Sequence, residues 1–166
     1  MNRAALAIAI ALSAALTTVG CSDPETASAP PTTAGAAAPG GFLGECGAAT
    51  DDDIRQITGF HALNAVARNG IKCVWESPNA DRQVMFTWFR GSPIERERTI
   101  ATVKGKDVGD FEVAGYRGFT ANAEELCQVA VQDGADFFHW MVYGPNVQPC
   151  EMLRPLAQLT IDRRGE

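Results

Sequence analysis

The sequence predicts an α+β domain, in which helices pack on an antiparallel sheet of about five strands. Three observations lead to this prediction. Apolar residues alternate along several short segments, most clearly Val84, Phe86 and Trp88 within 83–90. Turn-forming residues separate these segments, and helix-start signals interrupt the series. The length of 166 residues, with 46% hydrophobic and 20% charged side chains, fits one globular domain.

The first half of the domain is predicted to hold two helices and two strands. Thr50 is expected to cap a helix whose positive end is stabilised by Asp51–Asp53 and which Gly59 ends. Ser92 begins a capping box with the glutamate three residues later, and Pro93 suits the first helical position. The expected ranges are 50–59 and 92–103 for the helices, and 71–75 and 83–90 for the strands.

The second half is predicted to be mainly sheet. Short strands over 111–113 and 118–121 are joined at Ala114-Gly115-Tyr116, and strands over 127–132 and 136–143 are joined at Asp133-Gly134, a hairpin signal. A last helix is expected from Pro149 to about Ile161, with Pro155 as a source of kinking.

The N-terminus predicts export followed by a spacer. Arg3 precedes an apolar run over residues 4–15, which is too short for a stable membrane span of about 20 residues and is typical of a secretory signal peptide. Residues 22–41 are rich in Pro, Ala, Ser, Thr and Gly and contain no large apolar side chain. We therefore assign 1–20 to a signal peptide, 21–41 to a flexible tether and 42–166 to the globular domain.

The end of the signal resembles a bacterial lipobox. Its residues are Leu16-Thr17-Thr18-Val19-Gly20-Cys21, with Thr18 where leucine is commonest. In that motif the peptidase cuts before the cysteine, whose thiol carries diacylglycerol, so Cys21 is the predicted lipidation site. The alternative is an ordinary signal peptide whose Cys21 forms a disulfide with another cysteine.

The number of cysteines favours the lipid. Five cysteines cannot all form disulfides within one exported chain, but an even number of four remains for the domain if Cys21 is lipidated. Sequence alone leaves three connectivities open. From their places in the predicted elements we expect Cys73–Cys127 and Cys46–Cys150.

Candidate catalytic residues are few, and the sequence predicts no enzyme, metal site or cofactor. His61 follows a helix end, and His139 is expected to face solvent on a strand. Ser92 lacks the setting of a nucleophile elbow, and Asp51–Asp53 lack the spacing of a calcium loop.

Two features are candidate binding surfaces. Arg90, Arg96 and Arg98 lie near a predicted helix start and would suit an anion, although interleaved glutamates favour an ordinary charged helix. Aromatic residues occupy both faces of the predicted strands, so one set lines either a partner surface or a second packed layer. The candidate residues for an exposed apolar surface are Trp88, Phe89, Phe137 and Trp140.

The domain resembles the LprB/LprC-like group of actinobacterial lipoproteins, which share a domain of unknown function. The resemblance covers roughly Cys46 to the C-terminus. It is carried by the run FTWFRGSPIERER over 86–98 and by the segments Glu45-Cys46-Gly47, Cys73-Val74-Trp75, Leu126-Cys127-Gln128-Val129 and Pro149-Cys150. It implies an envelope lipoprotein and no particular activity.

Location is therefore predicted more sharply than mechanism. We expect an extracytoplasmic protein held by lipid on the outer face of the plasma membrane, with a non-catalytic accessory domain that binds an envelope protein or other component. The alternative is a carrier of a lipid or small apolar ligand between sheet and helices. The net charge of −6 and the pI near 4.9 argue against nucleic acid as a partner.

Overall fold

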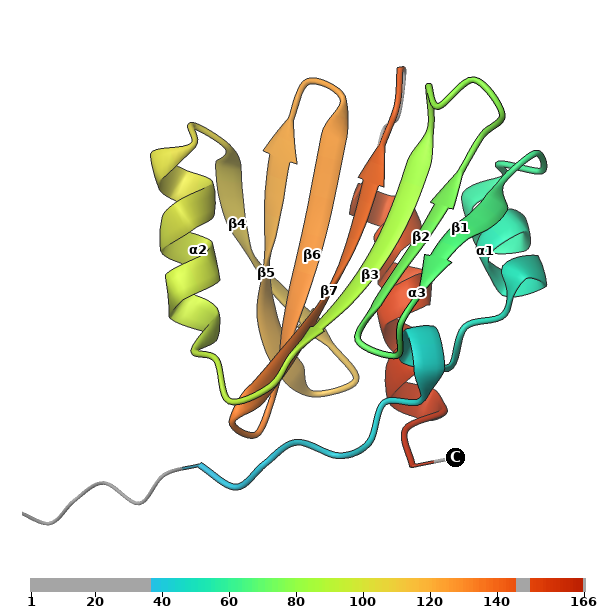
Figure 1. The fold of residues 1–166 in the computed structure, drawn as a ribbon. Helices are drawn as coiled ribbons and strands as arrows, with labels where there is room; N and C mark the ends of the chain where they lie inside the picture. Colours follow the sequence, from blue (N-terminus) through green and yellow to red (C-terminus); the bar gives the residue numbers. More distant parts are fainter. Residues whose placement is uncertain (1–36, 146–149, 166) are drawn as a thin grey trace, which may run out of the picture. The chain divides into compact units, whose positions relative to one another are not determined.

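A seven-stranded antiparallel sheet forms the centre of the computed structural model, which describes residues 37–145 and 150–165 (Figure 1). The strands lie in the order β1-β2-β3-β7-β6-β5-β4. Their bounds are β1 Asn64–Arg68, β2 Lys72–Glu76, β3 Gln83–Phe89, β4 Asp107–Val113, β5 Tyr116–Ala123, β6 Leu126–Asp133 and β7 Asp136–Tyr143. The helices are α1 Asp51–Thr58, α2 Ile94–Val103 and α3 Cys150–Asp162, preceded by the short 3₁₀ helix η1 Glu45–Ala48. The α+β class is confirmed.

The prediction of about five strands is wrong because the sheet has weakly patterned edges. β1 was not predicted at all. It is an exposed edge strand with a bulge between Ala65 and Ala67, so burial imposes no alternation of apolar residues on it. β4 begins at Asp107, four residues before the predicted start, and its first half is also largely exposed.

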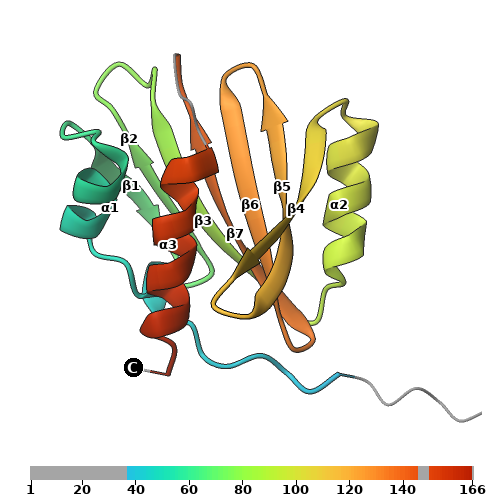
Figure 2. The ribbon, with the colours of Figure 1, turned by 180° about the vertical axis from the view of Figure 1, so that it is seen from behind.

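Helices cover the two faces of the sheet unequally. α3 lies across one face of the central strands (Figure 2), where Phe86, Trp140 and Leu156 belong to the main core. We call this the α3 face. α2 packs on the opposite face of β4, β5 and β6, around Phe119 and Phe137, which we call the α2 face. Successive residues of β3 and β7 therefore pack on different faces.

The start of α1 confirms the sequence signal, whereas the start of α2 does not. Thr50 and Asp53 form a reciprocal capping box, and Gly59 closes α1 in the left-handed conformation with φ 71°. The predicted capping box at Ser92 is wrong. Pro93 has extended angles, φ −67° and ψ 126°, and is itself the N-cap, without a side-chain cap.

The globular domain begins before the predicted boundary at residue 42. The Ala135 N–H donates to the Ala38 carbonyl at 2.8 Å, and the Gly41 N–H donates to Asp133 Oδ2 at 2.9 Å. Asp133 also accepts from Arg164 at 2.7 Å. Residues 38–41, which composition assigned to the tether, thus lie along the turn between β6 and β7.

All four cysteines of the domain form disulfides, but the predicted pairing is wrong. The bridges are Cys46–Cys73 and Cys127–Cys150, with Cα–Cα distances of 5.4 and 5.5 Å. Cys73 lies on β2 and Cys127 on β6, with β3 and β7 between them. Three strand spacings amount to about 14 Å, twice the separation that a disulfide can span.

We expect a non-reducing digest, read by mass spectrometry, to link Cys46 to Cys73 and Cys127 to Cys150. The bridges join residues 27 and 23 positions apart. Loops of this size correspond to about 3–4 kcal/mol of stability in the chain-entropy relation. The double variant Cys46→Ser/Cys73→Ser should lose about this free energy of unfolding, and Cys21→Ser should lose none. A peptide joining Cys73 to Cys127 would refute the assignment.

Candidate functional site

A groove of about 760 Å³ lies between the N-terminal half of α2 and the ends of β4 and β5. We call it the α2 groove. α2 is shorter than the strands it covers, so its start leaves part of the α2 face open. The lining residues are Ile94, Glu95, Arg98, Asp110, Phe111, Glu112, Arg117, Gly118, Phe119 and Gln132.

Arg98 is the central charged group of the groove. Its guanidinium donates to Asp110 Oδ1 at 2.6 Å and to the Gly118 carbonyl at 3.5 Å, and lies 5.5 Å from the centre of the Phe119 ring. Glu95 lies one turn earlier on α2, and its Oε2 is 4.0 Å from Arg98 Nε. These contacts orient the partly buried Arg98, and they place its cation between two exposed carboxylates.

The β4–β5 hairpin adds a second pair of opposite charges. Glu112 and Arg117 are direct cross-strand partners and both are exposed. These two residues and Asp110 are not among the site residues predicted from the sequence. The signal that identifies them is the turn at Ala114-Gly115: counting outward from it pairs residue 113 with 116 and 112 with 117.

The predicted anion site of three arginines is not formed. Arg98 lies over Phe119 on the α2 face, whereas Arg90 lies over the Trp88 ring at 4.8 Å on the α3 face. Arg90 Nε is also 3.8 Å from Asp136. Arg96 is exposed and, two residues before Arg98, points in nearly the opposite direction from the helix axis. The three guanidinium groups therefore lie in different environments and do not form a common anion site.

The aromatic residues form packed layers. Trp140 and Phe137 are 0% and 1% exposed, and Trp88 is buried too, so the prediction of a partner surface built from them is wrong. Phe89 is half-buried and stacks on Phe137 with 4.4 Å between ring centres. The alternative of a second packed layer is confirmed, because both faces of β7 lie beneath side chains of neighbouring elements.

His139 is buried, which corrects its predicted solvent-facing position. It lies on the α2 face, with Phe89 at its edge, and is only 8% exposed. Gln128 Nε2 contacts His139 Nδ1 at 3.4 Å, and Nε2 of the histidine has no partner among the described residues. Burial, with smaller contributions from Lys106 and Lys72, lowers the pKa of His139 to about 4.

Gln128 joins this histidine to two charged groups. Its Oε1 accepts from Lys106 Nζ at 3.0 Å, and its Nε2 donates to Glu97 at 3.1 Å. Burial, followed by repulsion from Lys104, lowers the pKa of Lys106, while Glu97 opposes the shift. The group therefore forms a polar layer between α2 and the sheet, and none of its members lines the α2 groove.

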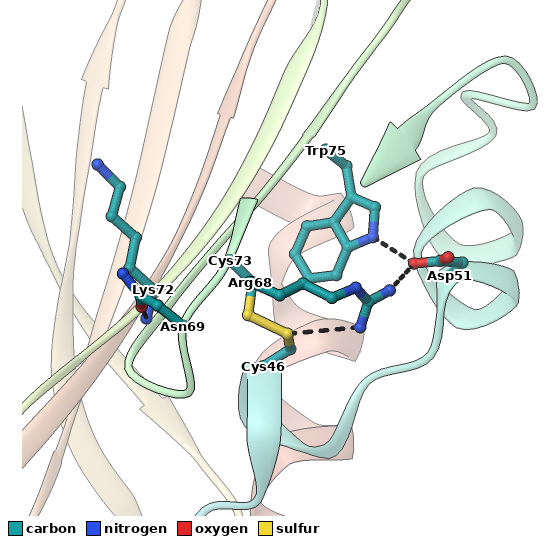
Figure 3. Close-up of a disulfide and its surroundings, with 7 residues drawn as sticks. All are labelled: Cys46, Asp51, Arg68, Asn69, Lys72, Cys73 and Trp75. Atoms are coloured by element: carbon teal, nitrogen blue, oxygen red, sulfur yellow. Dashed lines mark hydrogen bonds and ion pairs between the residues drawn. A yellow bond between two sulfur atoms is a disulfide. The ribbon is translucent and has the colours of Figure 1, made fainter. Parts of the chain in front are cut away.

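A second polar cluster lies beside a disulfide (Figure 3). Asp51 accepts from the Trp75 indole at 2.6 Å and also pairs with Arg68. The Arg68 guanidinium is 3.6 Å from the Cys46 sulfur and 5.6 Å from the Trp75 ring centre. The cluster ties η1, α1, β1 and β2 together, and each group is occupied by the others. Its role is structural.

Neither histidine lies in a metal-binding cluster within the described part of the chain. His61 is exposed in the loop after α1, whereas His139 lies beneath α2. Within residues 37–145 and 150–165, no three His, Cys, Asp or Glu side chains come together as a metal site would require. In the same residues no helix has the length and hydropathy to cross a membrane.

The sequence has recognisable relatives. Residues 16–163 match the family described as "Protein of unknown function (DUF3558)". The chain belongs to this family. The protein named "Putative lipoprotein LprB" from Mycobacterium tuberculosis is 31% identical over 133 residues, which cover 74% of this chain and 72% of the relative. The protein of that name from Mycobacterium leprae is 32% identical over 133 residues, with 74% and 71% covered.

The predicted resemblance to LprB-like lipoproteins is therefore confirmed. The Mycobacterium bovis protein, again 31% identical over 133 residues, has the same printed name. No solved structure is significantly similar to the chain. The DUF3558 match assigns the family without assigning an activity.

The buried His139 predicts a loss of stability in mild acid. Its pKa is about 4 in the folded protein and about 6.5 in the unfolded chain, so only the unfolded state gains the proton between these values. The free energy of unfolding should fall by about 3 kcal/mol from pH 7 to pH 4 on this account. Urea titrations at several pH values measure this pH dependence of the free energy of unfolding.

The variant His139→Gln should flatten this dependence even if it is less stable at neutral pH, and His61→Gln should keep it. Equal slopes for His139→Gln and the parent protein would contradict the assignment.

Proposed function

We propose that this protein is an extracytoplasmic lipoprotein, anchored through Cys21 to the outer face of the plasma membrane, whose domain binds a polar, charged ligand in the α2 groove without catalysing a reaction. The observation that carries the binding function is the lining of the groove. Five of its ten residues are charged, with both signs present.

The cysteine chemistry supports the anchor. Two disulfides use Cys46, Cys73, Cys127 and Cys150, so Cys21 is the one cysteine of the five without a place in them. It stands at the end of a lipobox-like signal, and the relatives are named as lipoproteins. Cys21 lies outside the described residues. Export would preserve the disulfides, and several acyl chains would hold the protein firmly.

The charges of the groove favour a polar ligand over an apolar one. A fatty chain laid along Arg98, Asp110 and Arg117 would displace water from charged groups and offer no hydrogen bonds in return. A ligand with an anionic and a cationic group, such as a peptide, would find partners for both. The carrier of apolar ligands is therefore not the function we propose.

The groove suits recognition better than bond-making. Its lining contains no serine, cysteine, histidine or lysine, and the carboxylate of Asp110 is held by Arg98. A nucleophile or general base would need a free, directed group. The arrangement supports a binding or accessory role in the envelope.

The anchor is tested by Cys21→Ser. Because the acyl chains are attached at this sulfur, the variant should leave the membrane fraction and partition into the aqueous phase of a detergent extraction, while the parent protein partitions with detergent. Cys46→Ser/Cys73→Ser is the control, since it changes two other cysteines and keeps the lipid. A Cys21→Ser protein that still sediments with membranes would refute the anchor.

The groove is tested by NMR titration of the Cys21→Ser chain with a tetrapeptide that carries one glutamate and one lysine. Shifts should concentrate at Gly118, Phe119 and Gln132. Arg117→Ala removes an exposed charged partner and should weaken binding about tenfold or more. Arg96→Ala, on another side of α2, should bind like the parent. Groove shifts produced by palmitate and not by the peptide would favour the carrier instead.

A further inference from the structure

The end of the domain at which the described chain begins carries a small apolar and cationic surface. Phe42 and Ile71 are 59% and 52% exposed. The Phe42 ring packs against Trp88 with 6.0 Å between centres, and the Ile71 carbonyl accepts from the Trp88 N–H at 2.8 Å. Arg90 lies over the same indole ring at 4.8 Å. We call these four residues the tether-end patch.

The patch is one surface because the strand register places its members on one side of the sheet. Ile71 lies opposite Trp88 at the ends of β2 and β3, one position beyond the pair Lys72 and Thr87. The Gly165 N–H donates to the Phe42 carbonyl at 2.9 Å, which brings the C-terminus to the same place. Single exposed apolar residues are ordinary on protein surfaces, but here two of them flank one tryptophan.

The charges around the patch are arranged with cations outward. The Arg90 side chain is 63% exposed, whereas Asp136, its carboxylate partner, is 3% exposed. Arg164 and Asp133 form a similar pair, in which the arginine side chain is 33% exposed and the aspartate side chain is 7% exposed. Lys72 follows Ile71 at the same end of β2 and is exposed, but its side chain points to the α2 face. In a chain of net charge −6, the outward charges beside the patch are thus the two arginines.

The patch also covers an unsatisfied donor. The Trp88 indole N–H is buried and has no acceptor among the described residues. Such a donor costs free energy, and it gains an acceptor if Phe42 turns outward and admits a phosphate or ester oxygen. Tryptophan is favoured at membrane interfaces for this combination of an apolar ring and a polar N–H.

The length of chain outside the structure fits a membrane as the occupant. If Cys21 carries the lipid, as proposed above, 16 residues over 22–37 connect it to Ala38, which is held at the β6–β7 turn. A chain of this length without fixed structure spans about 20–24 Å. The bilayer surface is then within reach of this end of the domain, at an effective concentration of the order of millimolar.

We propose that the tether-end patch docks the domain on an anionic lipid surface, with Phe42 and Ile71 entering the headgroup region and Arg90 and Arg164 facing phosphates. This inference rests on the proposed anchor. Each cation near an anionic surface adds a modest attraction that salt weakens. The two arginines favour an anionic surface over a neutral one.

The test uses the full lipidated protein reconstituted in vesicles of phosphatidylcholine, with or without phosphatidylglycerol. Hydrogen exchange is followed at the amides of residues 69–72 and 88–91. Docking for half of the time slows exchange about twofold. We expect this slowing, or more, only with phosphatidylglycerol, and we expect high salt to reverse it.

The variant Phe42→Ser/Ile71→Ser should exchange at the rate seen with phosphatidylcholine alone, while remaining bound to vesicles in flotation. Val103→Ser is the matched control, because Val103 is 82% exposed at the far end of α2. It should behave as the parent protein.

The outcomes separate the two proposals. A parent protein that does not float with vesicles overturns the anchor. A parent protein that floats but shows equal exchange with both lipids, or slowing that the double variant retains, overturns the docking surface alone. Slowing that requires an added envelope protein and no phosphatidylglycerol overturns it in favour of a protein partner.

Discussion

The pairing of β3 with β7 holds the domain together. It joins two separately connected sets of strands, β1–β3 and β4–β7, in a register that runs from Gln83 opposite Tyr143 to Phe89 opposite Phe137. Alternate residues of both strands point to opposite faces, so a slip of one residue would exchange the buried Phe86 and Trp140 with Met85 and His139. Every layer of the fold depends on this register, and it is formed between segments about fifty residues apart.

Two-sided packing also decides where the molecule can interact. The α3 face is closed around tryptophan and phenylalanine side chains, and α2 closes the opposite face over β4, β5 and β6. Beside the start of α2 a groove remains open, lined by Arg98 and its neighbours. Burial of His139 in the same layer is the cost of this arrangement, since a histidine without water or a counter-charge is stable only when neutral.

The two ends of the described chain meet at the turn between β6 and β7. Ala38, Gly41 and Phe42 are held there by backbone contacts and by Asp133, which also pairs with Arg164. A membrane anchor placed before this point would act on one end of the domain. The disulfide Cys46–Cys73 fixes the following segment to β2, so a pull on the N-terminus would be carried by the sheet. In our proposals the anchor and the patch together orient the domain on the membrane, and this orientation fixes where the groove lies.

The sequence by itself determined what short-range chemistry controls: the capped start of α1 at Thr50, the alternation along β3 and β7, and the hairpin at Asp133-Gly134. It also identified the family. The tertiary structure alone decided the cysteine partners, the burial of His139, the separation of Arg90 from Arg98, and the meeting of Arg98 with Asp110. These depend on which strands are neighbours and on which face each helix covers. Strand order is set by long-range packing, and no local pattern encodes it.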